Sequence, residues 1–141
     1  MGIEAAETEK GVVETFVEAV RDDDLDALDD VMDADLVYSQ PTGEVHGLAE
    51  YKEETQAVMA AFADVEIEVH EMVAEDDLVV VHFTFRGRHE GELQGIQPTG
   101  NTVELSEVII ARVEDGKIVE GNELYDGLSF FQQLGVDPPE L

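Results

Sequence analysis

Two glutamates, Glu107 and Glu123, occupy positions where the sequence pattern predicts the inner face of a β-sheet. Alternate residues of segment 103–113 are apolar except for Glu107, and Glu123 lies in a similar pattern after the turn at 114–116. Because successive strand residues point to opposite faces, each carboxyl is predicted to lie among core side chains. Two close carboxyls in an apolar setting cannot both ionise easily, so one of them keeps its proton. Such a pair is suited to acid–base chemistry.

The hairpin that joins the two segments decides how the glutamates meet. A three-residue loop at 114–116 that ends in a left-handed glycine predicts that Glu107 and Glu123 are directly opposed. Their Cβ atoms are then expected about 4.5–5.5 Å apart. The alternative is a register shift of one residue, which sends one glutamate to the outer face.

The composition is that of one globular domain, which we expect to span residues 1–141. There is no cysteine, so no disulfide is expected. No apolar segment approaches the roughly 20 residues that a membrane span requires, and the first residues do not have the pattern of a signal peptide. We therefore expect a cytoplasmic protein.

The net charge of −28, from 35 acidic and 7 basic residues, restricts the partners. It excludes ordinary binding to nucleic acid or to anionic membranes, which requires basic surface. Since the acids are spread over turns and polar helix faces, they predict a protein from a salt-accumulating halophile. The alternative, a calcium-loading protein, lacks a D-x-D-x-D-G loop. The histidine spacings predict no metal site.

The hydrophobic periodicity changes once along the chain, from helical to strand-like. Helices are expected at 4–20, 25–32 and 47–62, with a short strand at 36–39. Four strands follow at 65–73, 78–88, 103–113 and 118–125, and Asp126 is expected to cap a last helix that ends at Gly135 and Pro138-Pro139. This order predicts an α+β fold, a cone-shaped barrel in which a curved, mostly antiparallel sheet wraps over three N-terminal helices.

Several motifs in the last third of the chain carry a family resemblance. Residues 87–100 have the pattern G-x-H-x-G followed by G-x-x-P-T-G, and residues 113–120, Asp126 and residues 131–135 add to it. These segments resemble the SnoaL-like polyketide cyclases of the nuclear-transport-factor-2-like, or ketosteroid-isomerase-like, superfamily. The resemblance implies a cone-shaped α+β barrel with an apolar cavity, and an activity that uses no metal and no cofactor.

The resemblance also implies roles for three positions. In the characterised cyclases an aspartate on the last strand is the acid/base of an intramolecular aldol condensation, and that position looks like Glu123. A glutamine that helps to hold the substrate looks like Glu107, and a histidine two residues further looks like Ile109. This sequence therefore differs from the family pattern at all three positions.

Further residues are expected to line the cavity and contact a substrate. His89 matches a family histidine and shares strand parity with Phe85, so it is predicted to lean into the cavity near the mouth and to orient a substrate oxygen. A histidine that only stabilises the following turn is the alternative. Tyr38 is predicted to bond a ligand, or to fill the core with its hydroxyl at the rim. Phe85, Tyr125 and Met59 are predicted to form the pocket wall.

These features together predict an enzyme without a cofactor. It would remove a proton next to a carbonyl of a small hydrophobic compound, as an isomerase or aldol cyclase, with Glu123 as base. Glu107 would share the proton or donate a hydrogen bond to the enolate. The alternative for Glu123 is a structural carboxylate bonded to Tyr38 or Tyr51, and the alternative for Glu107 is a partner that only satisfies Glu123. The alternatives are a non-catalytic protein that binds a hydrophobic ligand and, more weakly supported, an accessory dimerisation domain.

The outer face of the predicted sheet is not polar throughout. Val108 and Ile110 point outward by parity, beside Leu78 and Val80 on the adjoining strand. Contiguous outward apolar residues are typical of an interface. We therefore expect a two-fold homodimer through this face; the alternative is that the C-terminal helix or the segment around Pro41 covers it.

Overall fold

The chain begins with helices and continues into long strands, as the periodicity predicts. The structure, a computed structural model, describes residues 2–138, and it describes side chains from residue 8 onward. The helical elements are α1 (Gly2–Arg21), the 3₁₀ helix η1 (Leu25–Asp30), α2 (Leu48–Ala61) and α3 (Gly127–Leu134). The strands are β1 (Met32–Gln40), β2 (Gly43–His46), β3 (Phe62–Glu75), β4 (Leu78–His89), β5 (Thr102–Glu114) and β6 (Lys117–Leu124).

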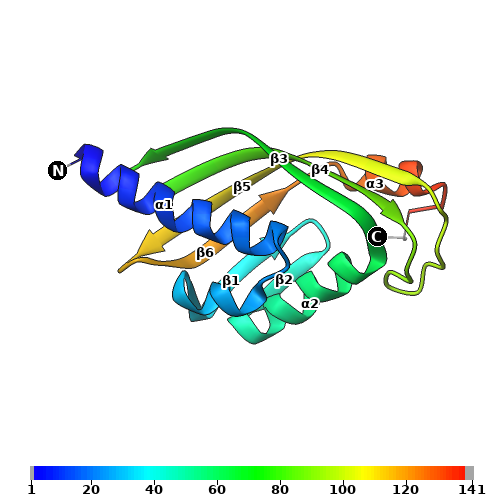
Figure 1. Cartoon of the computed structure of the whole chain (residues 1–141), viewed down its shortest axis with the longest axis horizontal. Helices are drawn as coiled ribbons and strands as arrows, with labels where there is room; N and C mark the ends of the chain where they lie inside the picture. The colour runs from blue at the N-terminus through cyan, green and yellow to red at the C-terminus, as the bar shows by residue number, and fades with distance from the viewer. Residues whose placement is uncertain (1, 139–141) are drawn as a thin grey trace.

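The six strands form one curved, open sheet in the order β2-β1-β6-β5-β4-β3 (Figure 1). Neighbouring strands are antiparallel except for β1 and β6, which run parallel. The helices α1 and α2 lie on the inner side of the curve, and α3 lies near the far end of the sheet (Figure 1). The prediction of an α+β fold with a short C-terminal helix is confirmed, and the sheet is mixed and does not close.

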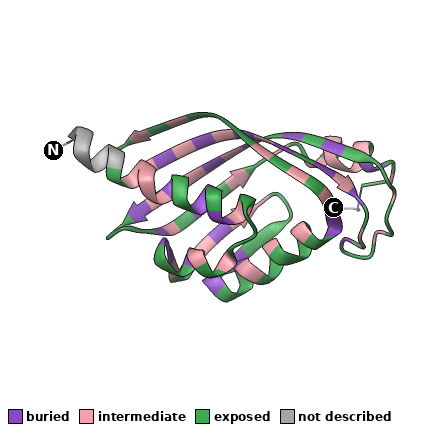
Figure 2. Cartoon of the chain, in the orientation of Figure 1, coloured by how far each residue is buried: buried purple, intermediate pink, exposed green. Residues whose placement is uncertain are grey.

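The core lies between the inner face of the sheet and α1. Val13, Phe16 and Val17 recur at helical spacing and are buried, so α1 presents one apolar stripe to the strands. Along β4, buried residues alternate with more exposed ones from Val79 to His89, because only one face of the strand meets the helices (Figure 2). None of the helices in the described part of the chain is long and apolar enough to span a membrane.

The region between α1 and α2 differs from the prediction. The helix expected at 25–32 is a 3₁₀ helix that ends at Asp30, and Met32 is already the first residue of β1. Aspartates, which are poor helix formers, occupy much of this segment. The expected strand at 36–39 is longer, and the segment after Pro41-Thr42 forms the unpredicted strand β2. Two short strands with little alternation carry too weak a signal to be found from sequence.

The hairpin between β5 and β6 has a tighter turn than predicted. Glu114 pairs with Lys117, so the loop contains only Asp115 and Gly116, with φ values of 52° and 78°. Positive φ at both residues is the type I′ geometry, which matches the twist of the strands. A bulge then shifts the register by one residue: Val113 pairs with Ile118, but its neighbour Arg112 pairs with Glu120. The predicted three-residue loop is therefore wrong.

The last helix has the predicted ends. The Asp126 side chain accepts a hydrogen bond from the backbone N–H of Ser129, and Gly135 ends the helix with φ of 79°. Pro139, part of the expected stop signal, lies outside the described residues. Beyond the end of β6, the Gln133 side chain bonds both the N–H and the C=O of Glu104. This pairing fixes α3 against β5 and places its aromatic residues at the end of the inner face.

Candidate active site

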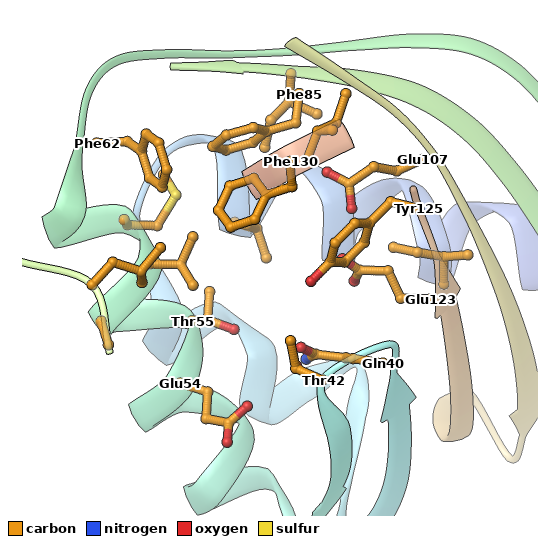
Figure 3. Close-up of a pocket in the computed structure, with 18 of the residues that line it drawn as sticks. Gln40, Thr42, Glu54, Thr55, Phe62, Phe85, Glu107, Glu123, Tyr125 and Phe130 are labelled. Atoms are coloured by element: carbon orange, nitrogen blue, oxygen red, sulfur yellow. The ribbon is translucent and has the colours of Figure 1, made fainter. Parts of the chain in front are cut away.

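A cavity of about 440 Å³ lies between the inner face of the sheet, α1, α2 and α3. This is within the usual range for small-molecule sites. Phenylalanines from two helices and two strands form much of its wall. Phe62 on β3, Phe85 on β4 and Phe130 on α3 are seen in Figure 3, and Phe16 on α1 adds to them. The wall is thus apolar and aromatic, and the few polar groups in it are placed to orient a ligand.

Glu107 on β5 and Glu123 on β6 both point into this cavity (Figure 3). The predicted direct opposition is wrong, because Ile109 is the residue paired with Glu123 and Glu107 lies two residues along β5. The predicted inner face is nevertheless correct for both carboxyls. The turn and the bulge together shift the register by two residues, and an even shift preserves the face on which each side chain lies.

Burial and the neighbouring charge both act on the Glu107 carboxyl. Glu107 is only 6% exposed. Its burial, then the charge of Glu123 and hydrogen bonding to Glu123, raise the pKa of Glu107 well above its ordinary value. Glu107 therefore keeps the proton at neutral pH, and the negative charge of the pair lies on Glu123, which is half-buried.

Tyr38 supports Glu123 from behind the cavity. Its hydroxyl donates to Glu123 Oε1 at 2.5 Å, the short distance typical of an O–H donor facing a carboxylate. The phenol is 1% exposed, and burial followed by the charge of Glu123 raises its pKa well above the ordinary value. Tyr38 thus stays protonated and fixes the orientation of Glu123.

Two further tyrosines lie on the cavity wall near the pair. Tyr51 on α2 packs edge-on against Tyr38, with ring centroids 4.7 Å apart. Burial, followed by the charge of Glu123, raises the pKa of Tyr51, although hydrogen bonds with Thr55 and Tyr38 act in the opposite direction. The same two causes raise the pKa of Tyr125 to about 12. Both hydroxyls therefore remain donors at neutral pH.

The structure distributes the predicted substrate-binding residues between two places. Ile109, Phe85, Tyr125 and Met59 all line the cavity. Tyr38 does not line it, but its hydroxyl bonds Glu123 and its ring packs against Tyr51, and both of these residues do line the cavity. Tyr38 therefore contacts the predicted base and is placed to act on a substrate through it.

His89 is fully buried and does not line the cavity. Its Nδ1 accepts the backbone N–H of Thr99 at 3.2 Å and lies 3.1 Å from the Thr99 hydroxyl. The ring packs beside Phe62, with centroids 5.5 Å apart. Its Nε2 has no hydrogen-bond partner among the described residues. In this position His89 holds the loop between β4 and β5, which is the structural alternative considered above.

The polar residues of the cavity that were missed from the sequence include Gln40, Thr42 and Thr55. Gln40 and Thr42 lie at the turn between β1 and β2, and Thr55 lies on α2 (Figure 3). Gln40 and Thr42 were missed because their segment has only the sequence features of a turn. Thr55 follows Tyr51 by one helical turn, so the inward position of Tyr51 was the available indication. Together these groups add hydrogen-bonding atoms to the cavity wall near the carboxyl pair and its tyrosines.

The described residues contain no group of three or more His, Asp or Glu side chains arranged to hold a metal ion. The acid–base groups on the sheet side of the cavity and beside it are Glu107, Glu123 and the hydroxyls of Tyr51 and Tyr125. Such a set can remove a proton from carbon, hold it, and donate hydrogen bonds to the oxygen that becomes negative.

Comparison with known proteins places this arrangement in a family. The chain is 30% identical to AclR from Streptomyces galilaeus, a proposed hydroxylase, over 90% of this chain and 95% of that chain, with a TM-score of 0.79. It is 28% identical to IdmH from Streptomyces antibioticus, a proposed polyketide cyclase, over 91% and 99% of the two chains, with a TM-score of 0.77. A SnoaL-like protein from Jannaschia sp. CCS1 shares the fold, with 20% identity over 94% and 95% and a TM-score of 0.86.

No functionally curated sequence matches the chain significantly. The family model for SnoaL-like polyketide cyclases matches residues 10–134, which includes every residue of the cavity described above. The chain therefore belongs to the SnoaL-like polyketide cyclase family.

Proposed function

We propose that this protein is a cofactor-independent enzyme that removes a proton next to a carbonyl group of a small hydrophobic substrate, in the manner of an isomerase or aldol cyclase. One observation carries the proposal: a carboxylate, Glu123, faces an apolar cavity beside a carboxyl that keeps its proton, Glu107. A base and an acid are thus present at the same place and at the same pH.

The reaction follows from the distribution of the shared proton. Glu123 takes the proton from the carbon next to the carbonyl, and the negative charge passes to the carbonyl oxygen as an enolate forms. Once Glu123 is neutral, the Glu107 proton is no longer held by a charge and is free to bond the enolate oxygen. Glu123 then returns its proton to another carbon in an isomerisation. In an aldol cyclisation, the enolate carbon attacks a second carbonyl and the proton goes to the new alkoxide.

Tyr38 is a positioning residue in this scheme. Because its hydroxyl holds Oε1 of Glu123, the carboxylate is kept in one orientation toward the substrate. Fixing the base in one orientation reduces the entropy lost on the way to the transition state.

Exchange of ketone protons with D₂O tests the proposal without knowledge of the natural substrate. Small aromatic ketones such as 2-tetralone and 1-indanone are titrated into the protein to measure binding, and the loss of their α-protons is followed by NMR. We expect wild-type protein to accelerate the exchange and Glu123→Gln to lose about 10²–10⁴-fold of the acceleration, the usual contribution of a general base. Glu68→Gln makes the same change on the outer face and should exchange normally.

Two outcomes contradict the proposal. If Glu123→Gln exchanges ketone protons at the wild-type rate, Glu123 is not the base. If ketones bind in the cavity but wild-type protein does not accelerate their exchange, the alternative of a non-catalytic ligand-binding protein is favoured.

A further inference from the structure

The charges around the cavity are all of one sign. Glu123 lies in its wall beside Glu107, which keeps its proton, and Glu53, Glu54 and Glu92 lie in its outer lining. None of the described residues that line it is a lysine, arginine or histidine. The negative charge of the carboxyl pair is therefore met by hydrogen-bond donors and not by a positive side chain.

No basic side chain in the described part of the chain lines the cavity, although two lie close to it: Arg21 donates to the backbone carbonyl of Ile67, and Lys52 follows Tyr51 on α2. Lys52 pairs with Asp29, and Arg86, Arg88 and Arg112 pair with acids on or beside the sheet. None of these four residues lines the cavity. An unpaired carboxylate in a partly desolvated site attracts a cation strongly, because little water is present to screen it.

Aromatic rings complete the environment of that charge. Tyr51, Tyr125, Phe83 and Phe130 line the same cavity as Glu123. Tyr125 and Phe130 meet edge to face, with centroids 6.3 Å apart. Rings of this kind attract an ammonium group through their negative faces, and rings combined with a carboxylate are a common way to bind alkylated amines.

An anionic ligand would be repelled by the negative charge in the cavity. Burial raises the pKa values of Tyr51 and Tyr125, and the charge of Glu123 raises them further. The second effect shows that the electrostatic potential at these two wall residues is negative. A carboxylate, phosphate or coenzyme-A thioester would add a like charge with no cation to receive it.

We propose that the natural substrate is a hydrophobic carbonyl compound that carries a protonated or quaternary amine and no anionic group. This rests on the proposed function only for the carbonyl; the preference for a cation rests on the lining of the cavity. The ammonium group would also suit the chemistry, since a nearby positive charge stabilises the enolate that forms when Glu123 takes the proton.

Three probes of similar shape test the charge preference alone. Benzyltrimethylammonium is a cation, neopentylbenzene is its neutral carbon analogue, and phenylmethanesulfonate is an anion. Their dissociation constants are measured by NMR titration of isotope-labelled protein, with the amide signals of Ile109 and Tyr125 reporting binding in the cavity. The titrations are made in about 1 M KCl, where the Debye length of about 3 Å suppresses attraction to the acidic surface.

The cation should bind at least about tenfold more tightly than its neutral analogue, which is a difference of about 1.4 kcal/mol in binding free energy. The sulfonate should not bind detectably. Glu123→Gln should remove most of the preference, because it removes the charge. Glu107→Gln should retain the preference, because Glu107 is the uncharged member of the pair. Glu68→Gln, on the outer face, should behave as wild type.

The proposal is overturned if the neutral probe binds as tightly as the cation, if the sulfonate binds comparably, or if none of the three probes binds. It is also overturned if Glu123→Gln keeps the preference or Glu107→Gln loses it. None of the probes contains a carbonyl group, so these results do not depend on catalysis. Conversely, a failure of the ketone exchange test leaves the charge preference standing.

Discussion

The ring of Tyr38 lies across the backbone of Gly121, in the space that a side chain at position 121 would fill. The two residues are paired in the parallel ladder between β1 and β6. A Cβ atom at Gly121 would overlap the ring carbons of Tyr38. Since Glu123 follows two residues along β6, the missing side chain allows the Tyr38 hydroxyl to reach it.

Gly121→Ala should therefore displace the Tyr38 ring and break its hydrogen bond to Glu123. We expect a loss of about 1–3 kcal/mol of unfolding free energy, the usual cost of overfilling a packed site. Denaturant unfolding measures this loss. The control is Gly11→Ala on α1, where a Cβ meets nothing within 4 Å; there we expect a gain of about 0.5–1 kcal/mol.

A second background separates steric crowding from the lost hydrogen bond. Tyr38→Phe keeps the ring and removes the hydroxyl. If Gly121→Ala acts partly by breaking the hydrogen bond, it should cost less stability in the Tyr38→Phe protein than in wild type. An equal cost in both backgrounds would show that Gly121 does not serve the contact with Glu123.

The raised pKa of Glu107 predicts that folding stability depends on pH. Its pKa in the folded protein is raised above the ordinary value of 4.5, so the folded state holds a proton that the unfolded state releases as the pH rises. Folding stability should therefore fall with rising pH above about 4.5, by at most about 1.4 kcal/mol per pH unit, until the folded pKa is passed.

Glu107→Gln removes this dependence, because an amide does not titrate. Relative to wild type, the variant should become progressively more stable as the pH is raised from 6 to 9. This whole range lies above the ordinary pKa of a glutamate carboxyl. Melting temperatures across the range measure the gain. Glu114→Gln, at an exposed position on the same strand, should show a constant difference from wild type. A constant difference for Glu107→Gln as well would mean that Glu107 ionises normally.

The net charge of −28 predicts a strong dependence on salt. Lys52, Arg86, Arg88 and Arg112 are already paired with acids, so few positive groups remain to offset the repulsion between the others. The melting temperature should rise steeply between about 0.1 M and about 1 M KCl, as the Debye length falls from about 10 Å to about 3 Å. A melting temperature that hardly changes would reject a halophilic origin.

The outer face of the sheet carries a contiguous group of apolar residues. Val80 is paired with Ile110, and Val108 with Leu124, so apolar residues are contiguous across β4, β5 and β6. Leu124 is 49% exposed, and Val73 on β3, beside Val80, is 61% exposed. We propose that a second copy of the chain covers this face.

Light scattering in about 1 M KCl, where the acidic surfaces repel each other least, measures the mass of the particle. Wild-type protein should be a dimer, and Val108→Glu combined with Ile110→Lys should give a monomer with an unchanged circular dichroism spectrum. A wild-type mass that remains monomeric at every concentration would end this hypothesis.

The sequence by itself determined the fold class and the faces of the strands. The period of two along residues 103–113 placed Glu107 inward whichever residue it paired with, and the same held for Glu123. The predicted hairpin loop was wrong, but the predicted faces of both glutamates were still correct. The turn and the bulge together changed the register by two residues, and a change of two leaves each side chain on the same face. The Asp126 cap and the left-handed Gly135 were likewise local signals.

Only the tertiary structure decided what each inward residue meets. Tyr38 and Glu123 are brought together by the parallel pairing of β1 with β6, and no local pattern records which distant strand becomes a neighbour. His89 has the parity of the cavity wall, yet the loop between β4 and β5 folds back, and Thr99 binds its Nδ1 away from the open space. Periodicity fixes the direction of a side chain, whereas its partner depends on contacts between segments far apart in the chain.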